Sequence, residues 1–138
     1  MIKVLYFSRE NRDSTWEYDY IKNEILNGIE FKAYFLSLDE VRKTSEKFDV
    51  FIYSCRDPEK YEWGYMPSYE DALECVIKLQ PKIVIQLSDE YCHEDLGNHN
   101  ELSKHCNLML RQYCHDSERN NIFGTPIPKY ENMIHMPL

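Results

Sequence analysis

The most constraining feature of this 138-residue sequence is a regular alternation of short apolar runs with segments that carry helix signals. The apolar runs lie at Ile2–Phe7, Asp49–Tyr53, Ile83–Leu87 and Leu108–Leu110. A short, continuously apolar run predicts a strand that is buried on both faces. Buried strands that alternate with helices are typical of a parallel sheet with helices packed against it.

Four segments between or beside these runs begin with a helix-capping residue and are predicted to be helical: 14–28, 39–47, 68–80 and 98–107. Ser14–Glu17 has the S-x-x-E form of a capping box, in which two side chains satisfy free N–H groups of the first turn. Gly28 follows this helix and is expected to end it in the left-handed conformation, which glycine adopts at little cost. The second of the four segments is the weakest, with Asp39 as its expected cap.

Two further strands complete the pattern. Apolar residues alternate with polar ones from Ile29 to Phe35, and Met133–Met136 is a short apolar run near the end of the sequence. We therefore expect one Rossmann-like α/β domain over residues 1–138. Its sheet is predicted to be doubly wound and mostly parallel, with five or six strands and helices on both faces. Only Pro137 and Leu138 follow the last predicted strand, with no helix to cover it, which favours the N-terminal half of a two-domain protein.

Composition excludes several classes of partner. Sixteen Lys and Arg residues stand against twenty-four Asp and Glu residues, a net charge of −8, so neither a nucleic-acid-binding surface nor an anionic membrane surface is expected. The first apolar run is too short for a signal peptide, and no later run is long enough to span a membrane. Five cysteines without C-x-x-C spacing favour reduced thiols, and the predicted location is the cytoplasm.

The candidate binding residues follow the predicted strands. In open α/β sheets, ligands bind outside the carboxyl ends of the strands. The polar residues in those positions are Arg9 and Glu10 after the first strand, Arg56 after the third, Ser88, Asp89 and Glu90 after the fourth, and Arg111 and Tyr113 at the fifth. Arginine side chains suit bidentate recognition of phosphate or carboxylate groups. Trp63, in an aromatic loop, either stacks on a sugar or packs over the sheet. The competing interpretation of all these residues is solvated loop tips.

Several common sites are excluded by their motifs. The loop after the first strand has no G-x-G-x-x-G sequence, so a bound NAD or FAD is not expected, and neither a Walker A motif nor a G-x-S-x-G elbow occurs. Histidines and cysteines are frequent after Cys92, but none has the close cysteine spacing of a structural zinc site. We therefore expect neither a metal nor a cofactor.

Three segments carry a resemblance to a known family. They are Ile83–Glu90 with its LSDE turn, Leu108–Tyr113 with its R-x-Y ending, and Ile134–Leu138 with its closing Pro-Leu. In these segments the sequence resembles the N-terminal half of exostosin-like glycosyltransferases. The resemblance covers roughly residues 83–138. It departs from the family in having no membrane anchor and no second half in this sequence.

The resemblance implies a function. The chain is then the acceptor-side half of a GT-B-type enzyme that moves a sugar from a nucleotide sugar to a glycan hydroxyl, while the missing half binds most of the nucleotide sugar. Asp89 or Glu90 is the expected general base, and Arg9 or Arg111 faces the leaving diphosphate. The isolated chain is expected to be inactive. The alternative is a noncatalytic Rossmann-like binding or interaction module.

Overall fold

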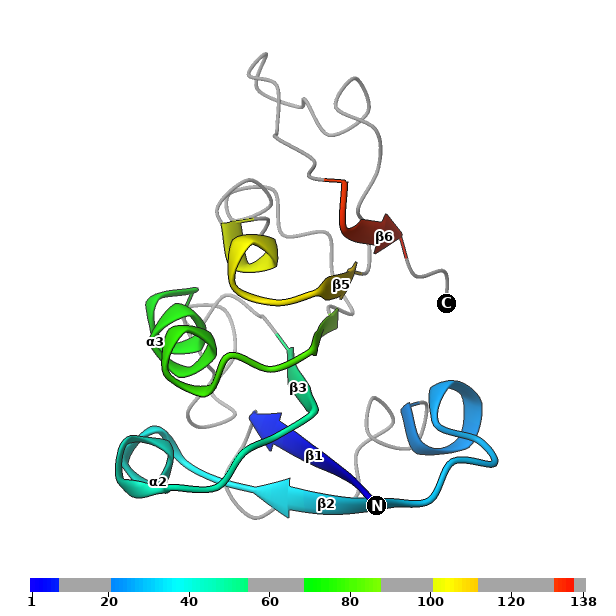
Figure 1. Cartoon of the computed structure of the whole chain (residues 1–138), viewed down its shortest axis with the longest axis horizontal. Helices are drawn as coiled ribbons and strands as arrows, with labels where there is room; N and C mark the ends of the chain where they lie inside the picture. Colours follow the sequence, from blue (N-terminus) through cyan, green and yellow to red (C-terminus); the bar gives the residue numbers. More distant parts are fainter. Residues whose placement is uncertain (8–20, 55–68, 88–100, 112–130, 136–138) are drawn as a thin grey trace, which may run out of the picture.

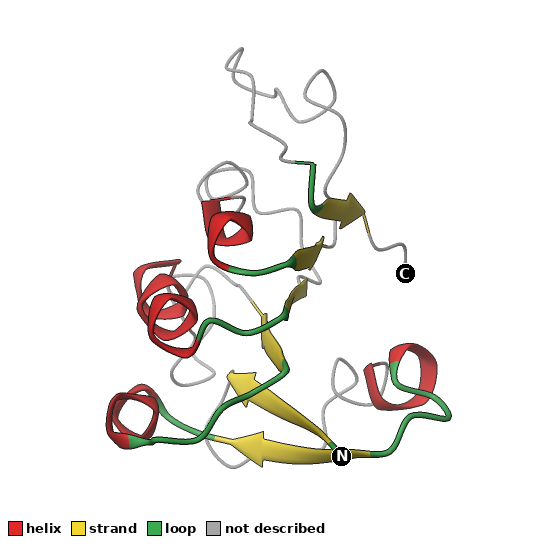
Figure 2. Cartoon of the chain, viewed as in Figure 1, coloured by secondary structure: helices red, strands yellow, loops and turns green. Residues whose placement is uncertain are grey.

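The computed structural model describes residues 1–7, 21–54, 69–87, 101–111 and 131–135. Among these residues, six strands form one sheet in which every neighbouring pair is parallel. The strands are β1 (Ile2–Phe7), β2 (Phe31–Phe35), β3 (Val50–Ser54), β4 (Ile83–Leu87), β5 (Leu108–Arg111) and β6 (Met133–His135). The helical elements are η1 (Ile21–Ile25), α2 (Leu38–Lys43), α3 (Tyr69–Leu79) and η2 (Glu101–His105). The predicted α/β class with a parallel, doubly wound sheet is confirmed (Figures 1 and 2).

The order of the strands is β2-β1-β3-β4-β5-β6, so the chain changes direction across the sheet at β1. It first moves from β1 to β2 on one side, and then crosses to β3 and continues strand by strand to β6. Because parallel crossovers are right-handed, this reversal sends the helices to opposite faces. Figure 1 shows η1 on one side of the sheet and α2, α3 and η2 on the other.

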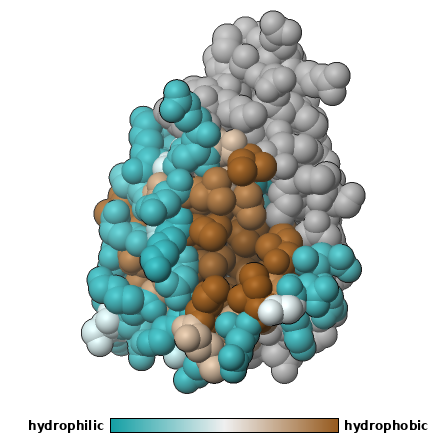
Figure 3. Space-filling model, turned by 45° about the vertical axis from the view of Figure 1, so that its right-hand side comes forward, coloured by the Kyte–Doolittle hydropathy of each residue, from teal (hydrophilic) through white to brown (hydrophobic). Residues whose placement is uncertain are grey.

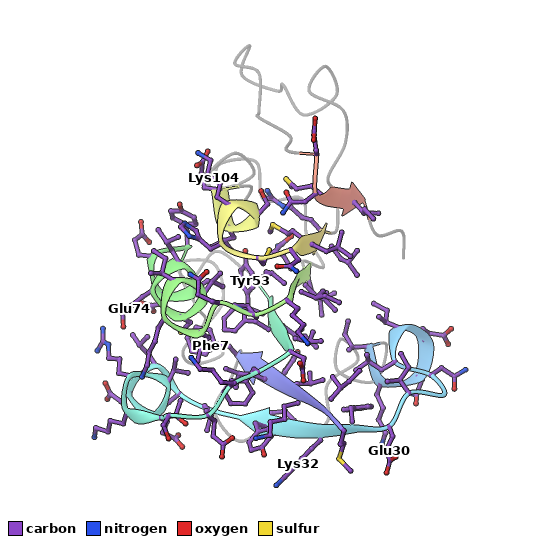
Figure 4. The ribbon with its side chains drawn as sticks, viewed as in Figure 1. Phe7, Glu30, Lys32, Tyr53, Glu74 and Lys104 are labelled. Carbon is purple, nitrogen blue, oxygen red and sulfur yellow. The ribbon has the colours of Figure 1, made fainter. Side chains whose placement is uncertain are left out.

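The face that carries α2, α3 and η2 holds the larger part of the core. Phe7, Phe51 and Tyr53 are fully buried there, and the ring centroids of Phe7 and Phe51 lie 5.6 Å apart. Figure 4 shows Phe7 and Tyr53 on the side of the sheet that faces α2 and α3. Burial continues along this face to the last strand, where Met133 is 3% exposed. Aliphatic and aromatic burial on this face is therefore complete from β1 to β6.

The opposite face is covered less evenly. Tyr6 on β1 and Ile52 on β3 are buried, and Ile21 and Leu26 belong to the same apolar cluster. Towards β6 the burial declines, and Ile134 is 51% exposed. Figure 3, which looks towards this side, shows apolar residues bordered by hydrophilic ones.

The helix α2 begins earlier than expected, because its cap lies two residues before the predicted one. Asp39 was the predicted cap, but Ser37 occupies this position because its Oγ accepts a hydrogen bond from the Glu40 N–H at 3.3 Å. The Glu40 carboxylate in turn accepts the Ser37 N–H at 3.3 Å, which completes a capping box. The helix ends at Lys43, four residues before the predicted end.

Two contacts tie α2 to α3. Arg42 donates to both carboxylate oxygens of Glu74, at 2.5 and 2.9 Å. Lys78 donates to the backbone carbonyls of Val41 and Arg42. Since the last carbonyls of a helix have no intrahelical partners, Lys78 both satisfies these groups and complements the negative end of the α2 dipole.

The first predicted helix is described only in its last turn. Ile21–Ile25 forms a π-helix, and the Leu26 N–H extends the wider spacing by donating to the Ile21 carbonyl at 2.8 Å. Gly28 has a φ of +78°, so the predicted left-handed conformation is confirmed. The short helix expected over 98–107 is the 3₁₀ helix η2 in its described part. Among the described residues, no helix has the length and apolar character needed to cross a membrane.

Candidate functional site

The strand order identifies the edge of the sheet where a ligand is expected. In doubly wound sheets the ligand binds outside the carboxyl ends of the strands, near the point where the strand order reverses. Here the reversal lies between β1 and β3, which end at Phe7 and Ser54. The carboxyl ends of β4 and β5, at Leu87 and Arg111, belong to the same edge because all pairs are parallel. We call this edge the carboxyl edge.

A buried polar pair lies at the carboxyl edge. Gln86 and Arg111 are direct cross-strand partners on β4 and β5, and they are 3% and 2% exposed. The Arg111 Nε–H donates to the Gln86 Oε1 at 3.2 Å. The Gln86 Nε2 donates to the backbone carbonyl of Leu87 at 3.1 Å. The two side chains therefore form a short hydrogen-bonded chain that ends on the backbone of β4.

This pair differs from its surroundings. Earlier on the same two strands, and on the same face of the sheet, stand Val84 and Met109, both fully buried and both apolar. The described buried polar residues are only Gln86, Ser103 and Arg111. Burial of a guanidinium disfavours the folded state unless its hydrogen bonds are satisfied, and an apolar pair serves stability equally well or better. A buried arginine at the ligand-binding edge of such a sheet is therefore a functional candidate.

Of the residues predicted to form the site, Arg111 lies among the described residues. The strand that carries it, β5, is paired with β4. Arg111 ends β5 and is enclosed by protein, with Gln86 as a hydrogen-bond partner and with further interactions besides. The other predicted residues lie outside the described residues: Arg9, Glu10, Arg56, Trp63, Ser88, Asp89, Glu90 and Tyr113.

Sequence reasoning missed Gln86. The signal was a single polar residue inside the otherwise apolar run Ile83–Leu87. Its significance comes from the strand register, which places it opposite Arg111.

The described cysteines do not extend the site. Burial raises the pKa of the Cys75 thiol to about 12 and that of the Cys106 thiol to about 11. A thiol with a raised pKa holds little thiolate near neutral pH and is a poor nucleophile. Within the described ranges, no group of three or more His, Cys, Asp and Glu side chains is arranged to hold a metal ion.

The opposite, amino edge of the sheet has a different character. Lys3, near the start of β1, and the residues that directly precede β3, β4 and β5 are linked by backbone hydrogen bonds: Asp49 N–H to Lys3 O, Lys82 N–H to Asp49 O, and Asn107 N–H to Lys82 O, at 2.9 to 3.0 Å. The Asp49 carboxylate accepts the Lys3 N–H at 2.9 Å, and this bond, together with Lys82, lowers the pKa of Asp49. These polar groups hold chain segments together.

Comparisons of the chain with protein-family models, with curated proteins and with solved structures gave no match. The feature that bears on function is therefore the carboxyl edge itself, with the buried Gln86–Arg111 pair. A guanidinium fixed there by a neutral partner is suited to an oxyanion, because its planar N–H donors match a phosphate or carboxylate.

Proposed function

We propose that this chain is the acceptor-side half of a GT-B-type glycosyltransferase, similar to the exostosin-like enzymes, and that it binds its ligands at the carboxyl edge. The single observation that supports this proposal most is the buried Gln86–Arg111 pair at the carboxyl ends of two adjacent parallel strands. The guanidinium of Arg111 is a cationic group of the kind that stabilises a leaving diphosphate. It lies at the edge of the sheet where doubly wound folds bind ligands.

The proposed reaction is a displacement at the anomeric carbon. The acceptor hydroxyl oxygen forms the new glycosidic bond, and the bond from the anomeric carbon to the diphosphate oxygen breaks. Asp89 or Glu90, which follow β4 in the sequence, takes the hydroxyl proton as general base. The diphosphate leaves with the bonding electron pair, and Arg9 or Arg111 stabilises the negative charge that develops on it. We place this activity in the cytoplasm.

Binding is the direct test of this proposal. The ¹⁵N-labelled chain is titrated with nucleotide diphosphate sugars, with neutral oligosaccharides and with uronate-containing oligosaccharides. We expect amide shifts at the ends of β1, β3, β4 and β5, and none for Lys3, Asp49 or Lys82 at the amino edge. Shifts confined to the amino edge, or no shifts with any ligand at millimolar concentration, contradict the proposal.

The half-enzyme character is tested separately. The isolated chain is incubated with a radiolabelled nucleotide sugar and an oligosaccharide that binds in the titration. We expect no labelled product, because closure between two halves is what excludes water and aligns the acceptor hydroxyl. Steady turnover by the 138-residue chain contradicts the assignment as half of an enzyme.

The second candidate is a noncatalytic interaction module. The observation that favours it is the decline of burial towards β6, where Leu110 is half-buried and Ile134 is 51% exposed on the same face of the sheet. An exposed apolar area of this kind is common at interaction surfaces. The titration above separates the two candidates, since an interaction module has no reason to bind any of the three ligand classes.

A further inference from the structure

We propose that two copies of this chain form a symmetric dimer in which their β2 strands (Phe31–Phe35) pair antiparallel, with Ala33 of each copy at the twofold axis. The pairing joins two six-stranded sheets into one continuous sheet. This inference goes beyond the proposed function and is independent of it, because it concerns the outer strand of the sheet and not the carboxyl edge.

β2 is the outermost strand on one side of the sheet. Among the described strands it pairs with β1 alone, through five consecutive positions from Ile2↔Phe31 to Tyr6↔Phe35. The outer side of such a strand presents a row of backbone N–H and C=O groups, and natural proteins usually shorten, kink or charge an edge of this kind. β2 contains no proline, and three of its five residues are aromatic. The opposite outer strand, β6, has three residues, so β2 is the edge better suited to pairing with another strand.

The sequence of β2, Phe-Lys-Ala-Tyr-Phe, is nearly symmetric about Ala33. In an isologous contact, residue i of one copy meets residue j of the other and j meets i, so a strand that pairs with itself needs compatible residues at equal distances from its centre. With Ala33 at the centre, Phe31 stands opposite Phe35 of the second copy, and Lys32 stands opposite Tyr34 of the second copy. Aromatic pairs directly across two strands stabilise a sheet, and this register opposes no like charges directly. The symmetry of the strand therefore favours a second copy over an unrelated strand as its partner.

The side chains of β2 have apolar surface left to bury. Tyr6, on the inner strand β1, is 1% exposed, whereas Phe31 and Phe35 pack against the same apolar cluster and are only half-buried. Ala33, which alternates with them on this face, is also half-buried. A strand added beside β2 covers these side chains from the outer side, as β1 does from the inner side. This burial adds to the free energy that the backbone hydrogen bonds of the new strand pair contribute.

Lys32 is compatible with this register, although a lysine on an outer strand usually opposes pairing. Its Nζ lies 5.0 Å from the centroid of the Tyr34 ring in the same copy, and Figure 4 shows the side chain extending from the outer side of β2. In the dimer, Tyr34 of the second copy stands opposite Lys32, so the cation lies beside two aromatic rings. The charge of Lys32 also contributes, after the hydrogen bond from Lys3, to the lowered pKa of Glu46, so a carboxylate lies near the cation.

The first experiment measures association of the wild-type chain. Each copy carries a net charge of −8, which opposes association, so we expect a reversible dimer that added salt strengthens by screening the repulsion. Sedimentation velocity over a range of protein and salt concentrations measures the dissociation constant. In NMR spectra, the amide signals of β2 should shift with protein concentration, while those of β6 should not. A chain that stays monomeric under all these conditions, or shifts at β6 without shifts at β2, overturns the proposal.

The second experiment tests the register with Tyr34→Lys, which places lysines directly opposite each other on both sides of the twofold axis. We expect the dissociation constant of the dimer to rise by about tenfold, because the symmetry doubles each cross-strand effect. The substitution also brings the net charge closer to zero, which by itself favours association, so a weaker dimer reports the local pair.

The matched control is the double variant Tyr34→Lys with Lys32→Glu, which places opposite charges at the same positions and should restore the dimer. Both variants lose the contact of the Tyr34 ring with Phe48, whose centroids lie 5.2 Å apart, so urea denaturation verifies that both are folded. An unchanged dissociation constant in Tyr34→Lys, or equal weakening in the single and the double variant, overturns the register.

The third experiment leaves Tyr34 in place. Opposed Cβ atoms in an antiparallel pair lie about 5 Å apart, so Ala33→Cys should be joined between copies by a short bis-maleimide. Lys47→Cys, at an exposed position outside β2, should not be joined to its counterpart. Mass spectrometry of the linked peptides separates these links from any at the five native cysteines. A dimer without a link at position 33 overturns the antiparallel pairing, whatever the ligand titration shows for the proposed function.

Discussion

The polar groups at the two edges of the sheet are hydrogen-bonded in different ways. At the amino edge, the start of β1 and the residues before β3, β4 and β5 are joined by backbone hydrogen bonds, and the side chains of Asp49 and Lys82 are partly or largely exposed. At the carboxyl edge, the polar groups of Gln86 and Arg111 are side chains, and they are buried. In the described part of the chain, the amino edge is therefore joined mainly by backbone hydrogen bonds, and the buried pair at the carboxyl edge is joined by side chains.

This difference distinguishes polar groups that stabilise the fold from polar groups that are candidates for ligand binding. Backbone hydrogen bonds at the amino edge are available to almost any sequence, and they continue the pairing of the strands beyond their ends. A buried arginine needs a specific partner and adds little to stability compared with an apolar pair. Substitutions at the amino edge are therefore expected to change the stability of the fold, while those at the carboxyl edge change ligand binding.

The largest expected effect is the loss of ligand binding in Arg111→Met. Arginine side chains at the centre of a binding site typically contribute 2 kcal/mol or more, about 30-fold in the dissociation constant. Lys82→Met, which removes a cation from the amino edge, should leave binding unchanged. Isothermal titration with the ligand found by NMR measures both, and the amide signals of Lys3 and Asp49 report whether the variants are folded. Equal losses in both variants would remove the distinction between the edges.

A smaller effect is expected for Asp49→Ala at the amino edge. The lowered pKa of Asp49 means that its stabilisation is present above pH about 4 and is lost as the pH falls through that lowered value. At pH 7 the variant should lose about 1 kcal/mol of unfolding free energy, and the difference from wild type should shrink as the pH falls through the lowered pKa of Asp49. Urea denaturation over this range measures it, with Glu30→Ala as an exposed control (Figure 4). A difference that is independent of pH contradicts the role of the carboxylate.

Ser103→Ala should stabilise the protein. Ser103 is 2% exposed and its Oγ has no hydrogen-bond partner in the described part of the chain, although its backbone carbonyl accepts the Asn132 side chain at 2.7 Å. Removal of a buried hydroxyl without a partner is expected to raise the unfolding free energy by about 1 kcal/mol. Ser45→Ala, at an exposed position, should have no comparable effect. A loss of stability in Ser103→Ala shows that the hydroxyl has a partner.

The smallest expected effect concerns the turn that leads into β4. Gln80 has a φ of +46°, in the left-handed region that favours glycine, and it directly precedes Pro81. Gln80→Gly should raise the unfolding free energy by about 0.5 kcal/mol, because relief of the backbone outweighs the added freedom of the unfolded chain. Gln80→Ala provides the comparison and should be about 1 kcal/mol less stable than Gln80→Gly. Equal stability of the two variants contradicts the strain.

The strands were predictable because their information is local. Ile2–Phe7 and Ile83–Leu87 were predicted with the bounds that the structure shows, since their short length and their content of β-branched or aromatic residues favour a strand over a helix. Helix boundaries depend on competition between neighbouring residues. Ser37 and Asp39 are both capping residues, and the choice of Ser37 depends on Glu40, which completes the reciprocal pair.

The candidate site was predictable only in part. Arg111 was predicted at the fifth strand, and the structure places it at the end of β5. The predicted role of Asp89 or Glu90 as general base stays a prediction, because both residues lie outside the described residues. The contact with Gln86 could not be read from the sequence, since it depends on the register of two strands separated by twenty residues of chain. A polar residue in a strand becomes informative when its cross-strand partner is known.

The strand order also has a consequence for how the chain folds as it is synthesised. The central strand β1 and both of its neighbours, β2 and β3, lie within the first 54 residues, so a three-stranded unit is complete before α3 leaves the ribosome. Each later strand then joins the edge made by the strand before it, in the order β4, β5, β6. The nascent chain is therefore expected to extend its sheet in one direction, each new strand pairing with the strand before it while β2 keeps the other edge.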